Sequence, residues 1–132
     1  PRPLLSGSQA DINNSSIVLK LAYKDVSLIF CGDIQEQGIE QLLRYRPMLQ
    51  STVLKVPHHG SYEGKVEDCF FEAVAPEFAV ISVRQDSQFG FPALEVVEGL
   101  EEVGAQVYTT ADSGAVTIST DGQNFWVKTM VR

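Results

Sequence analysis

The chain has 132 residues, of which 44% are hydrophobic and 20% charged, and this composition is typical of one globular domain rather than of a disordered segment. Seventeen acidic residues against ten basic ones give a formal net charge of −7, the wrong sign for a surface that grips nucleic acid by phosphate neutralisation alone. No apolar run approaches the roughly 18 residues of a membrane span, and the start has the pattern of neither a signal peptide nor a helix. We expect a soluble single domain over residues 1–132, in which a polyanion would require a metal or a partner domain.

The first quarter of the chain predicts a loop followed by two strands. Residues 1–15 are polar and rich in Ser, Asn and Gly, which favours a loop. Apolar residues then alternate from Ile17 to Ala22, and after a turn at residues 23–25 a continuous apolar run from Val26 to Phe30 ends at Gly32. We expect the two strands to pair as a hairpin.

The middle of the chain predicts alternating helices and strands. A helix opens at Glu36 and stops at Pro47, a second runs from about Val66 to Ala75, and a third begins with Pro92 in its first turn and closes at Gly104. The third helix is expected to turn one apolar face inward, formed by Leu94, Val97, Leu100 and Val103. Strands are predicted at residues 53–56 and 78–83.

The tail predicts three more strands, at residues 106–108, 115–119 and 125–131, with a hairpin signal at Asp121-Gly122. The expected fold class is therefore α/β, with a mixed sheet and about three helices. Cys31 and Cys69 lie within apolar runs, so we expect both to be buried small hydrophobic residues.

Candidate site residues follow two of the predicted strands. Asp33 comes directly after Gly32, a pattern that turn chemistry explains about as often as a metal site does. His58 and His59, the only histidines in the sequence, follow the strand at residues 53–56, and imidazole and carboxylate at converging strand ends are usual ligands of Zn²⁺ or Mn²⁺. Consecutive residues at a strand end point to opposite sides, so one histidine at most should face a given metal. Lys55 could face a phosphate or solvent.

Several segments together resemble a known family. In order and spacing, six segments of the chain resemble the metallo-β-lactamase-like domain at the carboxyl end of ComEC-type DNA internalisation competence proteins. These segments are Asn13–Leu19, Leu28–Asp33, Val53–Ser61, Ala79–Val83, residues 89–92 and residues 114–118. The resemblance covers nearly the whole chain. It implies the carboxyl-terminal half of a metallo-β-lactamase-like αββα sandwich, without the amino-terminal half of that domain.

The resemblance also implies roles for individual residues. Asp33 matches the aspartate that bridges two metal ions, and His59, favoured over His58, matches a ligand of the second metal. Catalytic and metal-binding roles thus fall on Asp33, His59, His58 and Lys55, and substrate-facing positions on Asn14, Ser16 and Ser61.

The chain departs from the family pattern in three places. Nothing matches the His-x-His/Asp-x-Asp-His cluster that supplies most ligands of the first metal. Phe91 stands where relatives commonly have the histidine of Gly-His-Pro, and Thr109-Thr110-Ala111 stands where they have Arg-Thr-Asp. Because a metal site wants at least three protein ligands, we expect this chain to bind Zn²⁺ or Mn²⁺ weakly or not at all by itself.

Three functions are compatible with these residues. The first is a metal-dependent phosphodiester hydrolase, a nuclease linked to DNA uptake, inactive in this fragment alone and set in a bacterial membrane protein with this domain outside the cytoplasm. The second is a non-catalytic scaffold that binds a partner or a DNA channel, and the third is another ester or lactone hydrolase of the superfamily. The expected partners are DNA, the missing amino-terminal half and, through an exposed sheet face, a second copy of the chain.

Overall fold

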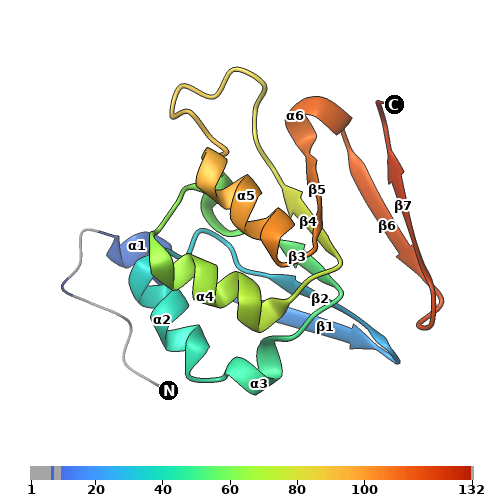
Figure 1. Cartoon of the computed structure of the whole chain (residues 1–132), viewed down its shortest axis with the longest axis horizontal. Helices are drawn as coiled ribbons and strands as arrows, with labels where there is room; N and C mark the ends of the chain where they lie inside the picture. The colour runs from blue at the N-terminus through green and yellow to red at the C-terminus, as the bar shows by residue number, and fades with distance from the viewer. Residues whose placement is uncertain (1–6, 8–9, 132) are drawn as a thin grey trace.

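The computed structural model describes residue 7 and residues 10–131, and a five-stranded sheet is its centre (Figure 1). The strands lie side by side in chain order. β1 and β2 form the expected antiparallel hairpin, and β2, β3, β4 and β5 pair in parallel, which confirms the mixed sheet. The strands are β1 Leu19–Tyr23, β2 Val26–Phe30, β3 Val53–Lys55, β4 Phe78–Ile81 and β5 Gln106–Thr109. The mixed α/β class predicted from the sequence is therefore correct.

Helices cover one face of this sheet. Figure 1 shows α2, α4 and α5 in front of the strands, and a separate antiparallel hairpin, β6–β7, beside β5. The helices are α1 Asp11–Asn14, α2 Glu36–Leu43, α3 Arg46–Leu49, α4 Lys65–Val74, α5 Leu94–Glu102 and α6 Thr110–Ser113; the hairpin strands are β6 Val116–Thr120 and β7 Phe125–Thr129. Within the described residues, no helix is long and apolar enough to cross a membrane.

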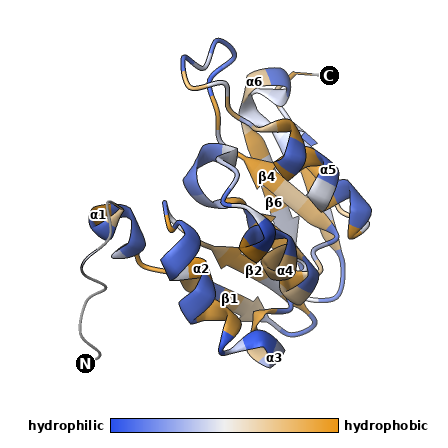
Figure 2. Cartoon of the chain, turned by 60° about the vertical axis from the view of Figure 1, so that its left-hand side comes forward, coloured by the Kyte–Doolittle hydropathy of each residue, from blue (hydrophilic) through white to orange (hydrophobic). Residues whose placement is uncertain are grey.

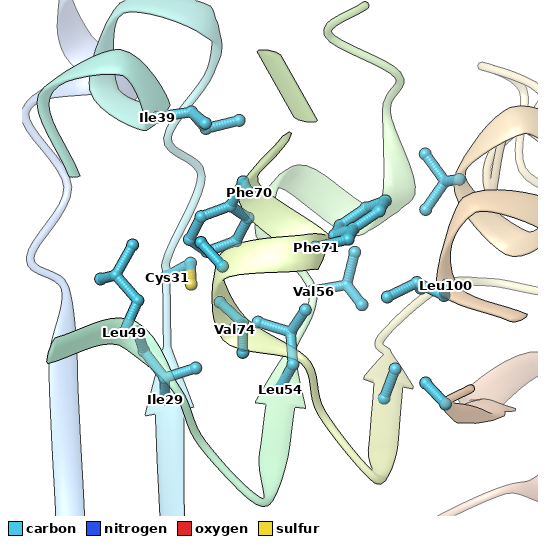
Figure 3. Packing of buried hydrophobic residues seen from close by; sticks show 14 of the residues in the cluster. Ile29, Cys31, Ile39, Leu49, Leu54, Val56, Phe70, Phe71, Val74 and Leu100 are labelled. Atoms are coloured by element: carbon cyan, nitrogen blue, oxygen red, sulfur yellow. The ribbon is translucent and has the colours of Figure 1, made fainter. Parts of the chain in front are cut away.

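The core lies between α4 and the sheet. Phe70 and Phe71 of α4 are fully buried and lie over Ile29 of β2 and Leu54 of β3, with Leu100 arriving from α5 (Figure 3). The inward positions of β2, β3 and β4 alternate because successive strand residues point to opposite faces. Figure 2 shows the same partition, with hydrophobic colour along β2 and β4 and hydrophilic colour on the outer surface of α2.

The opposite face of the sheet is only partly covered. Phe125 of β7 meets Phe78 of β4 edge to face with ring centroids 4.9 Å apart, so the β6–β7 hairpin lies over the β4–β5 side. On the β1–β2 side, Leu19, Leu21 and Phe30 are exposed. Leu19 pairs with Phe30 and Leu21 with Leu28, so these side chains share one face. A hollow of about 380 Å³ separates this part of the sheet from β6.

Several element boundaries differ from expectation because side chains bond to the backbone. The expected loop over residues 1–15 contains α1, where the hydroxyl of Ser15 donates to the Asp11 carbonyl; residues 1–6, 8 and 9 lie outside the described part. Pro47 does not stop a helix but sits in the first turn of α3, which proline tolerates. A further short helix, α6, begins where Thr109 Oγ1 accepts the Asp112 N–H at 3.1 Å.

Two other expectations about side chains are wrong. Helix α5 begins at Leu94, after Pro92; Leu94 is exposed and Val96 is buried instead, whereas Leu100 is buried and Val97 and Val103 pack against the core as expected. Cys69 is exposed on α4, whereas Cys31 is buried as expected. The helices outnumber the predicted three because α1, α3 and α6 are four-residue turns without an amphipathic repeat.

Candidate functional site at the carboxyl ends of the strands

The predicted site residues meet where three parallel strands end. Asp33 follows β2, His59 follows β3, and Ser82 follows β4. Because neighbouring parallel strands end at the same sheet edge, this edge is where open α/β folds hold ligands. The structure therefore brings Asp33 and His59 together although 26 positions in the sequence separate them.

Asp33 and His59 form a half-exposed pair. His59 Nε2 lies 3.8 Å from Asp33 Oδ1, and the side chains are 52% and 50% exposed. His59 Nδ1 lies 2.7 Å from the Ser82 carbonyl oxygen. A carbonyl oxygen only accepts, so Nδ1 carries the proton, and in the neutral ring the lone pair of Nε2 faces Asp33. A histidine that donates one ring N–H to a carbonyl and turns the other nitrogen outward has the arrangement of a metal ligand.

An unusual backbone conformation positions the two histidines. His58, His59 and Gly60 have φ values of +43°, +57° and +81°, the left-handed region that side chains rarely adopt. Two main-chain bonds hold this turn, from the His58 N–H to the Gly32 carbonyl at 3.1 Å and from the Ala93 N–H to the Gly60 carbonyl at 2.8 Å. Consecutive non-glycine residues in this region are costly and occur most often at ligand sites.

His58 faces a different set of residues from His59. Its Nε2 lies 3.4 Å from Asn13 Nδ2, and its Nδ1, which is buried without a hydrogen bond, lies 3.6 Å from Glu63 Oε1. Gln35 links these two partners, because it accepts from Asn13 and donates to Glu63, each at 3.1 Å. The strand alternation behind the expectation that one histidine at most faces a given metal does not apply, because both histidines lie in a left-handed turn after β3. Sequence reasoning missed Gln35 and Glu63, which no motif or periodicity marks.

Three of the other predicted residues are engaged in holding the loops. Asn14 is buried, and its Oδ1 accepts from the backbone of Gln35 at 2.9 Å and Gly38 at 3.0 Å. Ser16 Oγ accepts the Asp33 N–H at 3.1 Å. The backbone N–H of Ser61 donates to the His58 carbonyl at 3.0 Å. These bonds fix the approach of Asp33 and His58 to the site.

Lys55 and two buried acidic groups lie beneath the site. Lys55 Nζ donates to the Val56 carbonyl at 2.8 Å; burial lowers its pKa, and Cys31 and the Asp33 carboxylate oppose that shift. Burial raises the pKa of Cys31 to about 12, so it remains a thiol at neutral pH and is a poor metal ligand or nucleophile. Burial also raises the pKa of Glu67 to about 8.

A hollow of about 740 Å³ opens beside the histidines. His58 and His59 form one wall, and Arg84, Phe89 and Phe91, from the segment between β4 and α5, form another. The ring centroid of Phe91 lies 5.9 Å from that of His58. The mouth of the site is therefore largely apolar.

Asp33 and His59 fit a divalent metal as two donors of a larger set. A carboxylate oxygen and an imidazole nitrogen are ligands that Zn²⁺ and Mn²⁺ accept, and both atoms are turned to the same space. Among residues 7 and 10–131, no three His, Cys, Asp or Glu side chains lie close enough together to hold an ion.

Comparison with known proteins relates this chain to competence proteins. It is 31% identical over 107 residues to ComE operon protein 3 of Bacillus subtilis, an alignment that covers 81% of this chain and 14% of that protein. It is 33% identical over 107 residues to competence protein ComA of Neisseria gonorrhoeae, covering 80% of this chain and 15% of ComA. The similarity supports a relationship to ComEC-like competence proteins.

The alignments cover a small part of the length of each relative. The chain is also 28% identical over 127 residues, 96% of its length, to the uncharacterized protein YcaI of Escherichia coli, of which the alignment covers 17%. It therefore spans between about a seventh and a sixth of the curated relatives it matches. No family model and no solved structure matches the chain.

Proposed function

We propose that this chain is the carboxyl-terminal part of a metal-dependent phosphodiester hydrolase domain, metallo-β-lactamase-like in fold, that serves DNA uptake during competence. The observation that carries the proposal is the pair of Asp33 and His59, with Nε2 and Oδ1 3.8 Å apart and the proton of His59 held on Nδ1 by Ser82. The competence proteins among the relatives support the biological setting.

The residues of this chain would prepare one side of the site. Asp33 and His59 would hold a divalent metal, Zn²⁺ or Mn²⁺, which when bound polarises a phosphate and activates water. The Ser82 carbonyl keeps the His59 ring in one tautomer and orientation, so that Nε2 has a lone pair for a ligand without rearrangement.

The remaining donors would come from an amino-terminal half of the domain. Such a half would also cover the exposed β1–β2 side of the sheet, where Leu19, Leu21 and Phe30 face solvent. In this proposal the parent is a bacterial membrane protein with the domain outside the cytoplasm, DNA is its partner, and the fragment alone has little or no activity.

The test compares this chain with the same chain extended upstream to the complete domain. We expect the complete domain to bind Zn²⁺ or Mn²⁺ by calorimetry and to cleave a labelled single-stranded oligonucleotide, and Asp33→Asn and His59→Gln to abolish both. His58→Gln, one position away, should keep metal binding because His58 faces Asn13 and Glu63. A complete domain that holds no metal would overturn the proposal, and turnover of a generic ester in place of DNA would indicate an ester or lactone hydrolase.

A second candidate function is a non-catalytic scaffold that binds DNA or a partner protein. Phe91 favours it, because an apolar ring occupies the mouth where related domains are expected to carry a histidine. The scaffold predicts strand or partner binding by the complete domain without turnover and without a metal requirement.

A further inference from the structure

Four aromatic rings contact one another in succession, from His59 through His58 and Phe91 to Phe89. The ring centroids of His59 and His58 are 6.4 Å apart, those of His58 and Phe91 5.9 Å, and those of Phe91 and Phe89 5.7 Å. The last two rings are stacked, with 27° between their planes. All four residues line the same hollow of about 740 Å³.

The outer end of the row is open to solvent. Phe89 is 70% exposed although its ring is stacked on Phe91. Covering a water-exposed phenyl ring with another flat apolar group is favourable, because both lose contact with water. Aromatic rings prefer offset stacked or edge-to-face partners. The hollow thus presents a flat aromatic surface at its rim, and the exposed guanidinium of Arg84 lies on the same lining.

We propose that Phe89 and Phe91 form a stacking platform for unpaired bases of a single nucleic acid strand. The strand would lie along the row of rings, with a phosphate beside Arg84 and its backbone leading toward Asp33 and His59. This inference names how the substrate is recognised; it rests on the proposed function only for the cleavage that follows, because strand binding is measurable without turnover.

The charge of the chain disfavours recognition through phosphates. A formal net charge of −7 opposes binding by phosphate neutralisation, so affinity must come from contacts that do not need cations. Base stacking on aromatic side chains meets this need and accepts every base, since each has a π-face. Bases of a duplex are stacked within the helix and cannot reach the platform, so an unpaired strand is the ligand that fits.

A salt titration distinguishes this mode from electrostatic binding. Of the described residues lining the hollow, Arg84 is the one permanent cation, and one neutralised phosphate on a single strand gives a slope of about −0.7 for log affinity against log salt. We expect a slope between zero and about −1. A strand held by several phosphate contacts would give a steeper slope in proportion to their number.

The experiment uses fluorescence anisotropy with this chain and three labelled probes of equal length: oligothymidylate, an abasic deoxyribose-phosphate strand, and a duplex. We expect oligothymidylate to bind and the other two to bind at least tenfold more weakly. Phe89→Ala should weaken oligothymidylate binding about five- to hundredfold, and Phe89→Trp should restore it. The matched control is Trp126→Ala, which removes a 56% exposed aromatic side chain from β7 and should leave binding unchanged.

The outcomes separate this inference from the proposed hydrolase. Equal binding of the abasic strand, no binding of any probe, or an unchanged affinity in Phe89→Ala would overturn the platform even if the complete domain cleaves DNA. Binding that depends on bases and on Phe89 in a complete domain without hydrolysis would leave the platform standing and overturn the hydrolase. Proton chemical shifts of the Phe89 ring in the unsubstituted chain must also change when oligothymidylate is added, so the result does not depend on a variant that folds.

Discussion

The buried carboxyl group of Glu67 should make this protein less stable as the pH rises. Its Oε2 accepts the Glu63 N–H at 2.8 Å, whereas Oε1 is buried without a hydrogen-bond partner among the described residues. Desolvation raises the pKa of Glu67 from 4.5 to about 8, so the folded state keeps a proton that the unfolded chain releases. The stabilisation is therefore full below about pH 4.5 and is lost as the pH rises through about 8.

Glu67→Gln should remove this loss. The gap between 4.5 and about 8, at about 1.4 kcal/mol for each pKa unit, sets an upper limit of about 5 kcal/mol over all pH values, and we expect about 2–4 kcal/mol between pH 5 and pH 8.5. Glutamine keeps an oxygen for the Glu63 N–H and carries no charge. The two proteins should have similar unfolding free energies at pH 5, and the variant should be the more stable at pH 8.5.

Urea unfolding followed by circular dichroism at pH 5, 6.5 and 8.5 measures the difference. The matched control is Glu72→Gln, on the exposed side of the same helix, where the carboxylate pairs with Arg46 at 3.1 Å. An exposed pair is worth less than about 1 kcal/mol, and its loss should not grow with pH. If Glu67→Gln and the unsubstituted chain lose stability in parallel with rising pH, or if the variant is the less stable at pH 8.5, the buried carboxyl group does not cause the loss of stability.

Three further predictions concern the loops and the sheet. Gly60→Ala should lower the free energy of unfolding in urea by about 2–4 kcal/mol, because the residue has φ +81° and the new Cβ would lie 2.8 Å from Pro92 Cβ. Gly64→Ala, at φ +76° with open space around it, should lower it by about 1–2 kcal/mol, and equal losses in the two variants would contradict the steric argument. Ser16→Ala should lower the free energy of unfolding by about 1 kcal/mol, because it removes the acceptor of the Asp33 N–H. Ser119→Ala, on the exposed side of β6, should lower it by less than about 0.5 kcal/mol. An unchanged stability in Ser16→Ala would mean that water fully replaces the hydroxyl. Leu21→Lys should lower self-association of this chain in analytical ultracentrifugation, whereas Met48→Lys on α3 should not, and a monodisperse monomer at high concentration in the unsubstituted chain would refute association through the sheet face.

The strands were predictable because their pattern is dictated by burial. Apolar runs that stop at glycine mark β2, and short runs between turn residues mark β3 and β4, because a parallel strand covered on one side by helices needs apolar inward positions. The same argument placed Asp33 and the two histidines at one sheet edge, whereas the choice of His59 over His58 came from the family resemblance. Neither inference needs information about side-chain contacts.

The short helices and the surroundings of His58 were not predictable in this way. The first turn of α6 depends on the Thr109 hydroxyl, which accepts the Asp112 N–H, and the start of α2 depends on Asn14, which is remote in sequence from the residues it binds. Glu63 lies beside His58, and Gln35 bonds to Glu63, only through the folding together of separate loops, so spacing along the chain carries no signal of these contacts. The short helices and the surroundings of His58 depend on tertiary contacts, which a local sequence pattern does not reveal.

The turn at His58–Gly60 is tied to its neighbours by main-chain groups, namely the Gly32 carbonyl on one side and the Ala93 N–H on the other. No imidazole takes part in these two bonds. The course of this turn therefore does not depend on the two imidazoles, although the Ser16 hydroxyl and the Asn14 amide still hold the neighbouring loop. A domain built this way can change its ligand in evolution without first having to change its fold.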